Sequence, residues 1–155
     1  MELIKEDQQL FKLTAEDLMI SSEKVAHVQL NNPLEHALLI LVKSGYSAVP
    51  VLDSKYRFKG IIGKSTILNE IMGLERFEIE NLTTTTVENV MQTDVPCLPK
   101  SADLLSCIKA LIDHSFICLV DEKNYFDGIV TRKAVLEQLN RFFHVNKKDL
   151  KGFTF

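Results

Sequence analysis

The 155-residue chain lacks several features that would assign it to a specialised class of protein. It has no tryptophan and three cysteines, Cys97, Cys107 and Cys118, which form no CxxC pair. An odd number of isolated cysteines indicates neither a disulfide framework nor a zinc site, so we expect reduced thiols in a cytoplasm. With 46% hydrophobic and 25% charged residues, the composition is that of a soluble globular protein.

Charge and hydropathy exclude two classes of partner. The formal net charge is −3, whereas nucleic-acid-binding surfaces are usually basic. The longest apolar runs span only a few residues, so no membrane helix is expected. The first residues, Met1–Asp7, also lack the pattern of a secretory signal peptide, and we therefore expect a cytoplasmic protein that binds neither nucleic acid nor membrane.

Catalytic and metal-binding signals are also missing. The histidines show no metal-ligand spacing with one another or with the cysteines. Gly63-Lys64-Ser65 resembles the end of a phosphate-binding P-loop, but that motif requires glycine where this chain has Phe58. No arrangement typical of nucleophilic catalysis is present, so the sequence predicts neither an enzyme nor a metal or other cofactor.

The dominant positive feature is an internal repeat. A short apolar strand, Val49–Leu52, leads to Asp53, and seven residues later Gly60 opens a second strand. The same unit returns as Leu119-Val120-Asp121, again with a glycine, Gly128, seven residues after the aspartate. The helical turn Ala15–Met19 is echoed by Val87–Met91. One unit is therefore used twice.

Each repeat predicts the same order of elements. In the first, Thr14–Asp17 resembles a capping box, Val25–Leu30 a short strand, and Asn32-Pro33 a helix start with Asn32 as the cap. The predicted helix carries an apolar face and ends at Gly45, and two strands and a closing helix follow. The apolar face is Leu34, Ala37, Leu38, Leu41 and Val42. In the second repeat Ser101 is the expected helix cap.

The predicted architecture is α/β (α+β), with two βαββα-type repeats related by a pseudo-twofold, because neither repeat alone can bury its sheet face and helix stripes. We expect a leader helix at 1–13, the first repeat at 14–73 and the second at 87–141. Residues 74–86 are predicted to be a packed connector anchored by Phe77, Ile79 and Leu82. Residues 142–155 are a basic tail.

This repeated pattern resembles the CBS domain, present as a tandem pair (a Bateman module). In detail the chain is similar to the stand-alone cyclic-di-AMP-binding CBS proteins of Gram-positive bacteria. The segments that carry this narrower resemblance are Lys24–Val28, Gly45–Pro50, Gly73–Arg76 and Thr131–Lys133.

The resemblance implies an adenine-nucleotide site in a cleft between the repeats. The base would be held by residues at the entry to the first strand and just before the second, and ribose and phosphate by the turn after the last strand of the second repeat. Carried onto this chain, these residues are Lys24, Val25, Ala26, His27, Tyr46, Ser47, Ala48, Pro50, Thr131, Arg132 and Lys133.

The residue types suit that task. Tyr46 offers a ring for base stacking, and the small side chains of Ala26 and Ala48 allow the backbone to approach a flat base. Thr131 is expected to begin a helix, where amides attract an anion, and Arg132 supplies a planar fork for phosphate oxygens. Each residue also has a purely structural role open to it: packing for Tyr46, His27, Ala26, Ala48 and Pro50, solvation for Lys24, and helix capping for Thr131.

One departure from the nucleotide-binding CBS pattern is informative. The Asp that grips both ribose hydroxyls, three positions after the Thr, is replaced by Ala134. A carboxylate accepts hydrogen bonds from a free 2′,3′-diol but repels a 3′-linked phosphate. Its loss therefore favours a cyclic dinucleotide. The second repeat would form a similar cleft, but there Phe116 and Ile117 are bulkier than Ser47 and Ala48 in the first. We therefore expect one working site per chain.

We therefore expect a non-enzymatic, homodimeric sensor that binds cyclic di-AMP and thereby controls a target enzyme. By resemblance the target would be a metabolic enzyme such as a (p)ppGpp synthetase/hydrolase. The alternatives are a sensor of AMP, ADP or ATP, a structural CBS adaptor without ligand, and an undetected enzyme.

Overall fold

The computed structural model describes residues 10–145, which form two compact units. The first-repeat unit contains Lys24–Val95 together with Glu122–Phe126. The second-repeat unit contains the chain up to Glu23, Pro96–Asp121 and the chain from Asp127 onward. Each unit has its own cluster of buried apolar side chains.

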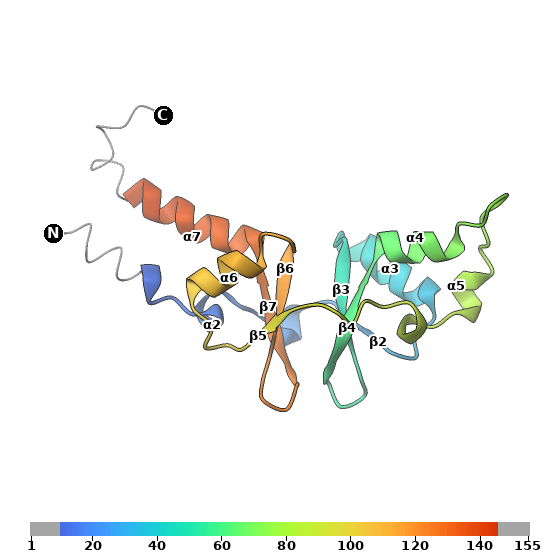
Figure 1. Ribbon diagram of the computed structural model, residues 1–155, viewed down its shortest axis with the longest axis horizontal. Helices are drawn as coiled ribbons and strands as arrows, with labels where there is room; N and C mark the ends of the chain where they lie inside the picture. Colours follow the sequence, from blue (N-terminus) through green and yellow to red (C-terminus); the bar gives the residue numbers. More distant parts are fainter. Residues whose placement is uncertain (1–9, 146–155) are drawn as a thin grey trace. The chain divides into compact units, whose positions relative to one another are not determined.

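The first-repeat unit is built on a three-stranded sheet in the order β2-β3-β4. Strand β2 (Val28–Gln29) runs parallel to β3 (Ala48–Leu52), which pairs antiparallel with β4 (Phe58–Gly63). Helices α3 (Leu34–Ser44) and α4 (Lys64–Ile71) lie on one face of this sheet (Figure 1). The short helices α5 (Asn81–Thr84) and η2 (Val87–Asn89) complete the unit.

Helix α3 confirms most of its predicted apolar face. Leu34, Ala37 and Leu41 are fully buried, but Val42 is 62% exposed and lies outside the core. The helix ends at Gly45, whose left-handed φ of 76° suits glycine and whose N–H donates to the Leu41 carbonyl.

The predicted cap of α3 was wrong. Pro33 is the N-cap residue, and the Asn32 side chain accepts a hydrogen bond from the Gln29 N–H at 2.7 Å. Asn32 therefore closes the turn after β2 and does not cap the helix, because an asparagine oxygen also suits a tight turn.

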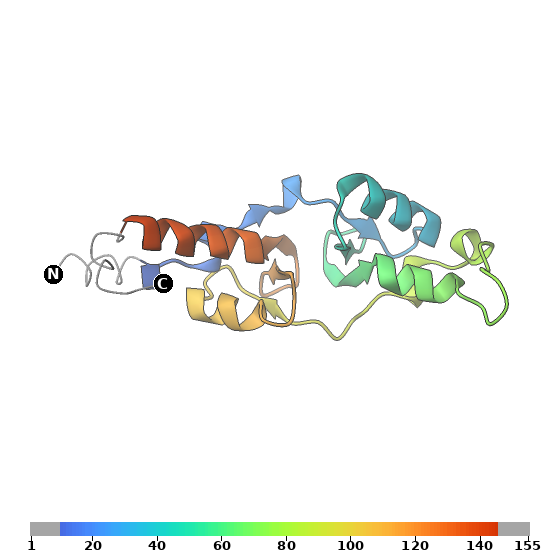
Figure 2. The ribbon, with the colours of Figure 1, turned by 90° about the horizontal axis from the view of Figure 1, so that it is seen from above.

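The second-repeat unit has a four-stranded sheet in the order β1-β7-β6-β5. Its strands are β1 (Ile20–Ser21), β5 (Cys97–Leu98), β6 (Phe116–Val120) and β7 (Phe126–Thr131). Its helices are α2 (Ala15–Leu18), α6 (Leu104–Ala110) and α7 (Arg132–Val145), and a 3-10 turn, η1 (Ser22–Lys24), leads into the other unit. Helices α6 and α7 lie side by side (Figure 2).

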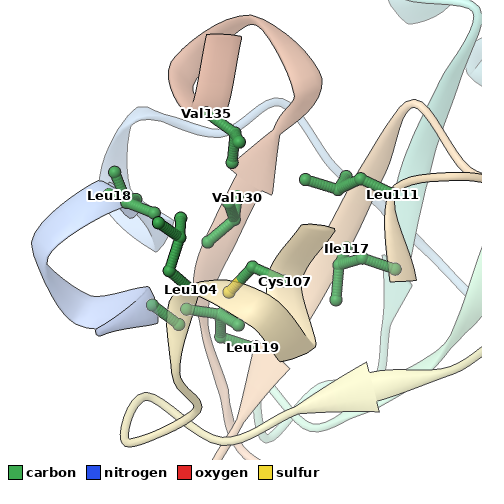
Figure 3. Close-up of a cluster of buried hydrophobic side chains, with 9 residues drawn as sticks. Leu18, Leu104, Cys107, Leu111, Ile117, Leu119, Val130 and Val135 are labelled. Atoms are coloured by element: carbon green, nitrogen blue, oxygen red, sulfur yellow. The ribbon is translucent and has the colours of Figure 1, made fainter. Parts of the chain in front are cut away.

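Side chains from α2, α6, α7 and the strands meet in one core (Figure 3). Leu104 and Cys107 of α6 meet Ile117 and Leu119 of β6, and all four are at most 1% exposed. At the start of α6 the cap is Asp103, which accepts from the Ser106 N–H at 2.8 Å, so the expected cap at Ser101 was wrong by two residues. The predicted capping box at Thr14 is present, because the Asp17 carboxylate accepts a hydrogen bond from the Thr14 N–H at 2.9 Å.

Each unit contains a short segment that belongs, by its place in the sequence, to the other repeat. Strand β1, which precedes the first repeat's sheet, pairs antiparallel with β7 of the second, with Ser21 opposite Gly128. In the other unit Gln92, which precedes the second repeat's sheet, exchanges two hydrogen bonds with Ile61. The repeated glycines lie at these crossings: a Cβ on Gly60 would lie 2.5 Å from the Gln92 carbonyl oxygen, and one on Gly128 would lie 2.2 Å from that of Ile20.

The connector differs from its prediction. Phe77 and Ile79 are each 62% exposed and do not anchor it, whereas Leu82 packs on the core of the first-repeat unit. Within the connector, Arg76 and Glu80 form an ion pair, and the hydrogen bond that the Arg76 guanidinium donates to the Glu80 carboxylate lowers the pKa of Glu80 to about 2.

Most of the predicted leader helix and tail lies outside the described residues. Within residues 10–145, no helix is long and apolar enough to cross a membrane.

Candidate nucleotide-binding residues

The predicted residues of the first repeat gather at one edge of its sheet. Strands β2 and β3 are parallel, with Val28 opposite Val51, so the segments that lead into the two strands lie at the same edge. These segments are Lys24–His27 and Tyr46–Pro50. The start of α4 joins this edge, because the Ser47 carbonyl accepts from the Lys64 N–H at 3.0 Å.

Exposure divides these residues by what they offer a ligand. Lys24 and Ser47 are exposed, and Tyr46 is 42% exposed immediately after the left-handed Gly45. Ala26, His27 and Ala48 are half-buried. Val25 and Pro50 are buried, so they shape the edge through backbone and packing and do not present a side chain.

The predicted residues of the second repeat lie at the start of α7. Thr131 caps the helix, because its hydroxyl accepts from the Ala134 N–H at 3.1 Å. The Arg132 N–H donates to the Ser115 carbonyl at 3.0 Å, which matches the Lys64–Ser47 bond of the first repeat. Lys133 is exposed.

Arg132 has a structural role that the sequence did not indicate. Its Nε donates to the Leu111 carbonyl at 2.7 Å and its Nη2 to the Ile112 carbonyl at 2.9 Å. The guanidinium therefore satisfies carbonyl groups at the C-terminal end of α6, where a cation is favoured. These two bonds fix the side chain in one orientation at the helix start.

The structure thus brings the eight first-repeat residues together in one unit and the three second-repeat residues together in the other. The corresponding edge of the second-repeat unit is buried to the same extent. Because Ser115 is the counterpart of Ser47, Phe116 corresponds to Ala48 and Ile117 to Val49, one residue away from the pairing that the sequence suggested. Phe116 and Ala48 are half-buried, and Ile117 and Val49 are each 1% exposed, so this edge differs by its bulkier side chains. Cys97 lies opposite Cys118.

The cysteines at that edge are unsuited to nucleophilic chemistry. Burial raises the pKa of Cys97 to about 11 and raises that of Cys118 further, with the neighbouring Cys97 as a second cause. Both thiols are therefore protonated at neutral pH. Cys97, Cys107 and Cys118 are all free.

Sequence reasoning missed one residue that contacts the predicted set from outside it. The Tyr56 ring lies 5.2 Å from that of His27, centroid to centroid, at an interplanar angle of 80°. Tyr56 lies in the turn between β3 and β4, and no local pattern marks it as part of a site. A separate surface hollow of ≈ 520 Å³ lies on the connector, lined by Gly73, Leu74, Glu75, Arg76 and Glu78, and contains none of the predicted residues.

The repeated order of elements and its spacing define the class of protein. The CBS domain family matches residues 15–73 and 87–141, and the chain belongs to that family as a tandem pair.

Particular relatives narrow the comparison. The chain is 46% identical over 136 residues to the cyclic di-AMP receptor B of Bacillus subtilis, covering 88% of this chain and 92% of that protein. It is similar to the CbpB protein of Listeria monocytogenes solved in complex with c-di-AMP, at 50% identity and a TM-score of 0.77, with 82% of this chain and 95% of that one covered. A CBS-domain protein of unknown function from Bacillus anthracis is 52% identical with a TM-score of 0.82, covering 87% and 98%.

Proposed function

We propose that this protein is a non-enzymatic, cytoplasmic receptor for cyclic di-AMP. The observation that carries the proposal is the extended similarity to a named cyclic di-AMP receptor, over nearly the whole length of both chains. The c-di-AMP complex of the Listeria relative, at 50% identity, supports the same ligand.

In this proposal each group of residues contributes its own kind of contact to cyclic di-AMP. Tyr46 stacks on an adenine, and the backbone around Ala26 and Ala48 contacts its edge, with Val25 and Pro50 shaping the surface beneath. Lys24, Ser47 and His27 add polar contacts. Thr131, Arg132 and Lys133 bind phosphate with amides and charge at the start of α7.

Thermal melts against a nucleotide panel test the ligand directly. Cyclic di-AMP, cyclic di-GMP, AMP, ADP, ATP and S-adenosylmethionine would be compared at one concentration. A ligand at a hundred times its Kd adds about 2.7 kcal/mol to the free energy of unfolding, so cyclic di-AMP is expected to give a clear rise in Tm. A rise with AMP or ATP alone would replace the proposal with an energy sensor, and no rise with any nucleotide would favour a structural adaptor.

The absence of an aspartate at position 134 gives a second test. Ala134→Asp places a carboxylate in the first turn of α7, where the helix dipole tolerates it, so the variant is expected to fold. That carboxylate repels a 3′-linked phosphate, so the affinity for cyclic di-AMP is expected to fall about tenfold. It also accepts hydrogen bonds from a free ribose diol, so the affinity for AMP is expected to rise. Isothermal titration with both nucleotides checks this, with Ala134→Asn as the uncharged control. Unchanged affinity for both would contradict the assigned ribose position.

We further propose that the protein acts as a homodimer. Large apolar side chains on the helices of both units, or within two residues of a helix end, are 45% to 69% exposed: Leu39, Val42, Leu68, Met72, Leu105, Ile112, Leu136 and Phe143. Exposed apolar faces of this kind suit a self-complementary interface. Sedimentation velocity at micromolar concentration would contradict the proposal if it gave a monomer.

The proposed output is control of a target enzyme such as a (p)ppGpp synthetase/hydrolase. The ligand-free protein binds the target, and cyclic di-AMP releases it because the ligand-bound state has lower affinity for that partner. Titration of a purified synthetase/hydrolase with the protein, with and without cyclic di-AMP, measures the difference. Equal affinities in the two titrations would reject this output.

A further inference from the structure

The turn between β3 and β4 carries a residue that acts on the proposed site from outside it. We propose that Tyr56 is a positioning residue: it sets the orientation of the His27 ring at the nucleotide-binding edge. Two paired turns, residues 53–58 and 122–126, hold Tyr56 in place. The effect on ligand affinity rests on the proposed function, whereas the effect on the His27 ring does not.

The two turns are joined by reciprocal hydrogen bonds within the first-repeat unit. The Phe58 N–H donates to the Asn124 carbonyl at 2.9 Å, and the Phe126 N–H donates to the Tyr56 carbonyl at 3.1 Å. The Asn124 side chain also donates to the Phe58 carbonyl at 2.6 Å. The contact forms a short antiparallel bridge, with Arg57 opposite Tyr125.

Tyr56 has a backbone conformation that tyrosine rarely adopts. Its φ is 68°, and that of Asn124, at the equivalent position of the other turn, is 69°. Asparagine tolerates this left-handed region well, but a bulky side chain does so only when its surroundings fix it.

Asp53 supplies that fixation at the start of the turn. Its carboxylate accepts from the Lys55 N–H and the Arg57 N–H, both at 2.9 Å, and from Arg57 Nε at 2.8 Å. The Tyr56 N–H donates to the Asp53 carbonyl at 3.0 Å. Charge-assisted bonds of this kind hold the turn rigidly, so the backbone position from which the Tyr56 side chain extends is fixed.

The ring then spans from the paired turns to the predicted site. On one side it contacts Phe126, with centroids 6.3 Å apart, and on the other it meets His27 edge-on at 5.2 Å. Edge-to-face pairs have a preferred geometry, so this contact selects one orientation of the imidazole. A hydrogen-bonding contact of His27 Nδ1 with the Val25 carbonyl, at 3.4 Å, is long and orients the ring weakly by itself.

The test separates the ring of Tyr56 from its backbone. Tyr56→Gly and Tyr56→Asn remove the ring but place residues that favour a positive φ, so the turn is retained or stabilised. Tyr56→Phe keeps the ring and is the conservative rescue. Lys55→Ala is the matched control, because it alters an exposed side chain of the same turn and keeps the backbone bond to Asp53.

The first readout is the NMR signal of the His27 ring protons in the ligand-free protein, assigned with His27→Gln. We expect these signals to move in Tyr56→Gly and Tyr56→Asn, through loss of the ring current, and to stay in place in Tyr56→Phe and Lys55→Ala. The second readout is the Kd for cyclic di-AMP by calorimetry. We expect it to rise about tenfold in the first two variants and to change less than twofold in the others.

Two results would overturn the inference. If the chemical shifts of the His27 ring protons do not change when the Tyr56 ring is removed, Tyr56 does not position His27. If they move while the Kd stays within twofold, the positioning has no role in binding. If the unmodified protein does not bind cyclic di-AMP at all, the proposed function fails, and the His27 signals alone still decide whether Tyr56 orients that ring.

Discussion

Replacing Gly128 with alanine is expected to lower the free energy of unfolding by about 3 kcal/mol, the upper end of the usual range for overpacking. The added Cβ would lie 2.2 Å from the Ile20 carbonyl oxygen and 2.6 Å from Met19 Cγ. A methionine side chain can move aside, but the Ile20 backbone belongs to strand β1, which pairs with β7 at this residue. The alanine therefore forces the two strands apart. Urea unfolding followed by circular dichroism measures the loss.

Gly45→Ala is the matched control for this prediction. Gly45 has a left-handed φ of 76°, but a Cβ there has no atom within 4 Å. Its replacement is therefore expected to cost only the backbone term, about 1 kcal/mol. If Gly128→Ala costs no more than Gly45→Ala, the close crossing of β1 over β7 is not what requires glycine.

Arg132→Ala is expected to weaken cyclic di-AMP binding about thirtyfold, which corresponds to about 2 kcal/mol for the loss of charge-assisted bonds to phosphate. The same change removes the bonds to the Leu111 and Ile112 carbonyls, so the free energy of unfolding is expected to fall by about 1 kcal/mol. Calorimetric titration gives the first effect and urea unfolding the second. Arg132→Lys keeps the charge without the planar fork and is expected to be intermediate in both.

Lys109→Ala provides the control that separates the two effects. Lys109 is an exposed basic residue in the last turn of α6, the helix that Arg132 caps, and is absent from the proposed site. Its loss is expected to lower stability slightly and to leave ligand affinity unchanged. An Arg132→Ala protein with reduced stability and unchanged affinity would show that Arg132 is a helix cap and not a phosphate ligand.

Most of the fold was predictable because it rests on local patterns used twice. The seven-residue step from Asp53 to Gly60 and from Asp121 to Gly128 identified the paired strands, and Gly45 identified the end of α3. The helix caps were less predictable, since Asn32 and Ser101 lie next to other residues able to begin the helix. Competing caps within one turn differ by too little free energy for sequence to choose between them.

Features set by contacts between distant segments were not predictable. The two-residue strand β1 has no sequence pattern that indicates its pairing with β7, because its partner lies more than a hundred residues away. The sequence placed Arg132 at a helix start but gave no sign that its guanidinium caps a different helix. Tyr56 was likewise unmarked, because its contact with the His27 ring joins segments that are far apart in the sequence.

The exchange of segments between the units has a consequence for a nicked chain. The exposed connector, with Leu74, Phe77 and Ile79 at its surface, is an obvious site for proteolysis. A cut there leaves β1 on the N-terminal fragment but within the sheet of the second-repeat unit. It also leaves Gln92 and the 122–126 turn on the C-terminal fragment but within the first-repeat unit. Breaking one peptide bond therefore does not free either half: the fragments separate only when β1 leaves the edge of the second-repeat sheet and when Gln92 and the 122–126 turn leave the first-repeat unit.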